Sequence, residues 1–77
     1  MVGQEQQKLR ADLISRLFAQ LTGKFEDAAM IAADCQGVRS NETLTEGAER
    51  LREIAQEAMT ITEATLEILG RLVAGPR

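Results

Sequence analysis

Cys35 is the side chain of this sequence best able to act as a nucleophile or redox group. A reactive thiol is usually activated by a nearby histidine or by the positive end of a helix. The sequence contains no histidine, and Cys35 lies near the C-terminal end of a predicted helix, where the dipole disfavours a thiolate. We therefore interpret Cys35 as a small apolar packing residue. Because it is the only cysteine, it has no disulfide partner within the chain.

Carboxylates form a second candidate group, spaced at helical steps of three and four residues. They are Glu42, Glu46, Glu49, Glu53 and Glu57. Metal sites in helical bundles usually combine such glutamates with Glu-x-x-His motifs, and this chain has none. Glycine-rich phosphate loops and nucleophile-elbow motifs are also missing. The sequence predicts a non-enzymatic protein with no catalytic, cofactor-binding or metal-binding residues. We interpret the acidic stripe as a solvated outer face; the alternative is a strip that steers a basic partner.

The charge balance and the apolar runs bear on the partners of the protein. The chain of 77 residues has a net charge of −3, so binding to nucleic acid is not expected in general. No apolar run approaches the roughly 20 residues of a membrane span, and MVGQEQQKLR lacks the apolar core of a signal peptide. These features, with the free thiol, predict a cytoplasmic protein that does not enter membranes.

The first half of the chain predicts one long helix, from about residue 4 to residue 36. One apolar column recurs every seven residues, and a second lies four places further on. The first column is Ile14, Leu21, Ala28 and Cys35, the second is Phe18, Phe25 and Ala32, and Leu17 and Ile31 widen the stripe. Gly23 lies inside this pattern without shifting its phase. The alternative is a break at residues 22–24, which would give three helices.

The second half predicts a helix from residue 44 to about residue 73, after a turn at residues 37–43. Gly37 is expected to end the first helix in a left-handed conformation. Thr43 and Glu46 fit a capping box, with Asn41 as a competing cap. Two columns with 3-4 spacing follow, as in paired helices: Leu44, Leu51, Ala58, Thr65 and Leu72 form one, and Gly47, Ile54, Ile61 and Ile68 form the other.

Two long helices joined by a short turn predict an all-α fold, an antiparallel two-helix hairpin that forms a single domain over residues 1–77 with a short C-terminal tail. The alanine-rich stretch FEDAAMIAADC, residues 25–35, then becomes a close packing face near the turn. Small residues on the facing helix let the two backbones approach, and Cys35 is expected near Leu44.

More apolar side chains are present than one pair of helices can cover. We predict that the hairpin homodimerises into a four-helix bundle. The candidate interface residues are Leu13, Leu17, Phe18, Met59, Leu66, Leu69 and Val73. The predicted function is that of a small regulatory or interaction protein that binds another protein through its bundle surface.

Two alternatives use the same sequence differently. In the first, the chain is a small chaperone or adaptor subunit, similar in shape to secretion co-chaperones, that holds a helix of a different protein on its apolar flank. In the second, which the net charge makes less favourable, it is a dimeric nucleic-acid-binding regulator that uses Lys8, Arg10 and Arg16.

Overall fold

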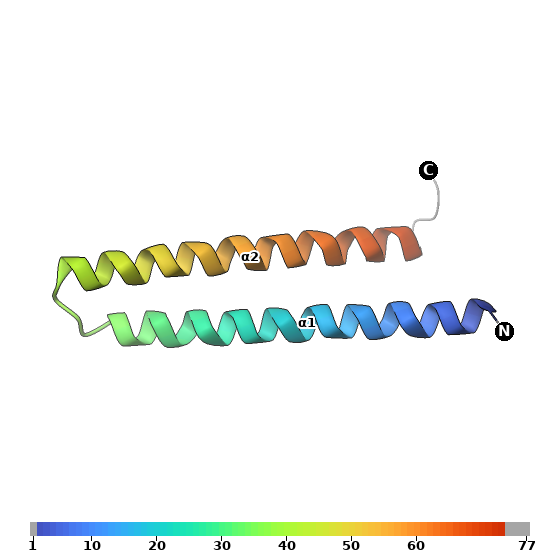
Figure 1. Ribbon diagram of the computed structural model, residues 1–77, viewed down its shortest axis with the longest axis horizontal. Coiled ribbons are helices and arrows are strands. Elements are labelled where there is room, and N and C mark those ends of the chain that lie inside the picture. The colour runs from blue at the N-terminus through green and yellow to red at the C-terminus, as the bar shows by residue number, and fades with distance from the viewer. Residues whose placement is uncertain (1, 74–77) are drawn as a thin grey trace.

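The chain folds as an antiparallel hairpin of two long helices (Figure 1). A computed structural model describes the backbone of residues 2–73 and the side chains of residues 3–70. Helix α1 spans Val2–Cys35 and helix α2 spans Asn41–Val73. Within this range every element is helical, as predicted. Helix α1 continues through Gly23 without a break, so the three-helix alternative is wrong.

The two helices meet along a seam that repeats every seven residues. We letter the repeat a to g, with Ile14, Leu21, Ala28 and Cys35 at position a of α1. The side chains shielded on α2 follow both predicted columns, position a from Leu44 and position d from Gly47. Ile54 is 1% exposed, and Ala58 and Thr65 are also buried. The core therefore lies along the middle of α2 and toward its C-terminal end, away from the turn.

On α1 the second predicted column does not face α2. Phe18 and Phe25 are 52% and 58% exposed, and Ala32 is exposed as well. The half-buried column instead runs through Leu17, Lys24 and Ile31 at position d. Those residues lie three places after position a, whereas the phenylalanines lie four places after it. A helix advances about 100° per residue, so position d lies about 60° to one side of position a and position e about 40° to the other. Helix α2 packs on the side of position d, which leaves Phe18 and Phe25 on the flank.

The turn between the helices differs in detail from the expected caps. Gly37 does not take a left-handed conformation; the end of α1 is closed by bonds of the 3₁₀ type, from Gln36 N to Ala33 O at 3.2 Å and from Val38 N to Cys35 O at 3.3 Å. Ser40 caps α2, because its Oγ accepts a hydrogen bond from Thr43 N at 3.4 Å. Helix α2 therefore starts at Asn41, three residues before the predicted start, and Thr43 is its third residue.

The molecule is long and flat, with Cα extents of 59 × 23 × 12 Å. Its radius of gyration is 17.6 Å, whereas a compact domain of 77 residues is expected to have about 11 Å. The hairpin is a single layer of two helices, so each helix packs against only one neighbour. Both broad sides of the hairpin are consequently open to solvent.

Candidate functional site

One broad side of the hairpin is apolar. In an antiparallel pair, positions e and b of both helices turn toward the same side. Helix α1 places Phe18, Phe25 and Ala32 there at position e, with Ala29 beside them at position b. Helix α2 contributes Ala48 and Ala55 at position e and Met59 and Leu66 at position b; all eight are exposed. We call this set the apolar face.

The largest side chains of the apolar face are also among the most exposed apolar residues of the molecule. Met59 is 58% exposed and Leu66 is 63% exposed, close to the values of Phe18 and Phe25. The half-buried Thr62 and Leu69 continue the same side at position e of α2. A contiguous patch of this kind usually marks a surface that another molecule covers.

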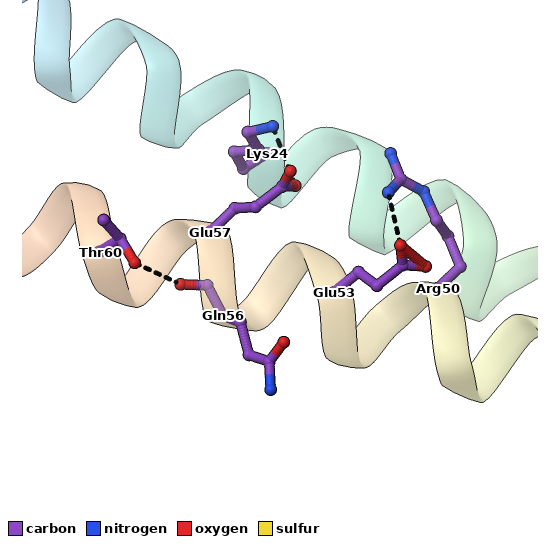
Figure 2. A network of polar contacts seen from close by, with 6 residues as sticks. All are labelled: Lys24, Arg50, Glu53, Gln56, Glu57 and Thr60. Atoms are coloured by element: carbon purple, nitrogen blue, oxygen red, sulfur yellow. Dashed lines mark hydrogen bonds and ion pairs between the residues drawn. The ribbon is translucent and has the colours of Figure 1, made fainter.

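The opposite broad side is polar and carries an ion pair between the helices (Figure 2). Lys24 occupies position d, level with the small Ala58, and its stem crosses the seam. Its Nζ donates a hydrogen bond to Glu57 Oε1 at 3.1 Å. Glu57 is at position g, as are Asp27, Asp34 and Arg50, so charged groups gather on this side. The two sides of one thin hairpin therefore differ in charge, although the exposed Leu9, Leu13 and Met30 lie at positions c and g on the charged side.

Other polar side chains are satisfied within their own helix. Arg50 Nη1 lies 3.9 Å from Glu53 Oε2, and Thr60 Oγ1 donates to the carbonyl oxygen of Gln56 at 3.1 Å (Figure 2). Thr62 and Thr65 bond in the same way to the carbonyls of Ala58 and Ile61. Such hydrogen bonds to the preceding turn are typical of threonines within helices, and they let Thr65 lie buried in the seam without an unpaired hydroxyl.

Cys35 packs against Gly47 of the facing helix. A Cβ atom at residue 47 would lie 2.5 Å from Cys35 Sγ and 3.9 Å from Ile31 Cγ2. The thiol therefore occupies the space that the missing side chain leaves on α2. This contact sets the register of the hairpin, because Cys35 and Gly47 lie level with each other.

The candidate interface residues do not share one surface. Phe18, Met59 and Leu66 lie on the apolar face, and the half-buried Leu69 lies at its edge. Leu17 lies in the seam of the hairpin. Leu13 is exposed at position g, on the polar side. The side chain of Val73 lies outside the described residues.

Sequence reasoning missed two residues of this arrangement. It placed Phe25 in the apolar stripe of the first helix but did not name it among the candidate interface residues, although the residue lies on the apolar face. It overlooked Lys24 as a seam residue because its charge interrupts the apolar column. The strict 3-4 spacing of Ile14, Leu17, Leu21, Ala28, Ile31 and Cys35 has a single vacancy, at residue 24. That spacing is the feature of the sequence that could have identified Lys24 as a seam residue.

The described residues hold no group of three or more cysteine, aspartate and glutamate side chains that could bind a metal ion. They form no pocket. Within the same part of the chain, neither helix has a stretch long and apolar enough to cross a membrane. Comparisons of the sequence with family models and curated proteins, and of the fold with solved structures, found no match.

Proposed function

We propose that this protein is a non-enzymatic interaction protein that homodimerises through its apolar face into an antiparallel four-helix bundle and binds another protein through the surface of that bundle. The observation that carries the proposal is that, among the described residues, four of the seven exposed large apolar side chains, Phe18, Phe25, Met59 and Leu66, lie on one side of the hairpin, and both phenylalanines are among them. Lys24, which is the charged residue of the seam, and the acidic side chains lie outside the apolar face. Two such faces pressed together would leave the polar sides outward.

The accessible surface area supports self-association. The chain exposes 6274 Å², whereas a compact monomer of 8.4 kDa is expected to expose about 4,600 Å². If each copy covered the excess, the interface would total about 3,300 Å², within the range of obligate homodimers. Each large apolar side chain that becomes fully buried contributes on the order of 1.5–3 kcal/mol.

The test is to place a charge on each side of the hairpin. Phe25→Lys and Leu66→Lys should shift the protein from dimer to monomer in sedimentation equilibrium at micromolar concentration, because an unpaired ammonium is costly to bury. The matched controls are Gln20→Lys and Ala64→Lys, which put the same charge at position g on the polar side. They should leave the dimer intact. A monomeric parent protein, or equal effects on both sides, would contradict the proposal.

A second candidate function is supported by Met59. Methionine is flexible and packs against varied partners, and its exposed position suits a face that holds a helix of a different protein. This adaptor hypothesis requires the isolated chain to be monomeric and to form a complex of defined stoichiometry with that helix. Sedimentation of the isolated chain distinguishes the two functions, because a dimer supports the first and a monomer supports the second.

A further inference from the structure

The apolar face, taken with the distribution of charge along the hairpin, points to a specific arrangement of the second copy. We infer that the two hairpins pack with their turns at opposite ends, related by a two-fold axis across the middle of the long dimension. This inference rests on the proposed homodimer. It identifies the occupant of the apolar face as a second copy of this chain and states how that copy is oriented.

The first step is the position of the large apolar side chains along the hairpin. Because Cys35 lies level with Gly47, each step forward on α1 matches one step back on α2. Met59 is then level with Gly23, and Leu66 is level with Arg16. The four large side chains of the apolar face consequently lie between the levels of residues 16 and 25, near the middle of helix α1, which spans Val2–Cys35.

This central position permits two symmetric dimers. A two-fold axis along the hairpin would place both turns at the same end, and α1 would lie over α2 of the partner. An axis across the hairpin would place the turns at opposite ends, and each helix would lie over its own copy. In both arrangements the two faces overlap along their full length and neighbouring helices run antiparallel, so packing of apolar side chains alone does not choose between them.

Charge does choose. The half of the hairpin that contains the turn, residues 19–61, carries eight acidic and four basic side chains, a net charge of −4. The open half of the two helices, residues 2–18 and 62–73, carries four of each and has no net charge. With the turns at the same end, two halves of charge −4 would lie side by side and repel each other. With the turns at opposite ends, each acidic half lies beside a neutral one.

Among the described side chains, the side of the apolar face itself carries one basic residue in each half and no acidic one. Lys8 lies at position b of α1 in the open half, and Arg52 lies at position b of α2 in the turn half. The acidic residues of α2, including Glu42, Glu49 and Glu53, lie at the outer positions f and c, so the choice between the two arrangements rests on the net charge of each half.

Distances between spin labels test the arrangement. In a Cys35→Ala background, one variant carries a label at Asn41→Cys, at the start of α2. A second carries it at Ala19→Cys, which is exposed and near the middle of α1. Circular dichroism and sedimentation first establish that both labelled proteins are helical dimers. Double electron–electron resonance then measures the distance between the two copies of each label.

With turns at opposite ends, each Asn41 label lies about 20 residues from the two-fold axis, so the pair should be about 60 Å apart at a helical rise of about 1.5 Å per residue. The Ala19 labels should be much closer, since packed helices lie only about 10 Å apart. A short distance at both sites would overturn the inference and leave the proposed dimer standing. No dipolar coupling at either site, with a monomer in sedimentation, would overturn both.

Discussion

At the scale of single residues, the contact between Cys35 and Gly47 is the most demanding in the hairpin. Glycine is a poor helix former, and alanine at an exposed helical site is favoured by about 1 kcal/mol. At residue 47 that gain is opposed, because the added methyl group would lie 2.5 Å from Cys35 Sγ. The glycine in the second turn of α2 is therefore explained by the sulfur atom on the facing helix.

Gly47→Ala should destabilise the protein in spite of its higher helix propensity, because overpacking typically costs about 1–3 kcal/mol. In a Cys35→Ala background the sulfur is gone, and the same substitution should be neutral or stabilising by up to about 1 kcal/mol. Urea denaturation of the four proteins of this double-mutant cycle measures the coupling. Additive effects of the two substitutions would show that the sulfur does not restrict residue 47.

Lys24 shows how a charged residue can occupy a seam position. Its side chain is 31% exposed and its ammonium group meets Glu57, whose side chain is 48% exposed. An ion pair this open to water contributes only about 0–1 kcal/mol. The small Ala58 at the same level leaves room for the lysine stem, and the stem shields apolar surface while the charge reaches the polar side.

At the scale of elements, the start of α2 depends on Ser40. Its hydroxyl oxygen accepts the Thr43 N–H, and its carbonyl accepts the Leu44 N–H at 3.0 Å, which is the geometry of an N-terminal cap. The turn has few other hydrogen bonds with which to orient α2 against α1. Loss of the cap should therefore fray the first turn of the helix.

Ser40→Ala should lower the free energy of unfolding by about 0.5–2 kcal/mol, measured by urea denaturation at fixed protein concentration. The comparison is Thr43→Ala, which removes the hydroxyl of the predicted capping box. Because the main-chain N–H of residue 43 is unchanged by that substitution, its effect should stay within about 0.5 kcal/mol. If Thr43→Ala is the more damaging change, the cap lies at residue 43.

At the scale of the whole molecule, two helices share a narrow core. Leu21, Ile54, Ala58 and Thr65 are buried, while the apolar face remains open. Small domains with a core of this size usually depend on a cross-link, a metal or association. We expect folding and dimerisation to be coupled in this protein, with the second copy supplying the missing half of the core.

Coupled folding makes thermal stability depend on concentration. The melting temperature measured by circular dichroism should rise steadily as the protein concentration is raised from about 1 to 100 μM. Phe25→Lys should remove most of this dependence, and Gln20→Lys should retain it. A melting temperature that is independent of concentration for the parent protein would mean that the hairpin folds alone.

Much of this fold could be read from the sequence. The two helices, the turn after Cys35 and both seam columns of α2 follow from composition and from the seven-residue spacing of Leu44, Leu51 and Ile54. These features are local, because a helix's own periodicity sets which of its residues share a face. Whether the exposed face is covered by a second copy is a separate matter of association, and it stays a prediction.

What the tertiary structure decided was which stripe of α1 faces α2. Two columns flank Ile14, Leu21, Ala28 and Cys35: an unbroken apolar one through Phe18 and Phe25, and one interrupted by Lys24. Hydrophobicity within α1 favours the first, but the fold uses the second. The small Ala58 leaves space for Lys24, and Glu57 binds its ammonium group. Both residues lie 33 or more positions further along the chain, so no pattern within α1 contains the information. Setting the phenylalanines outside the seam is what gives the hairpin its apolar face.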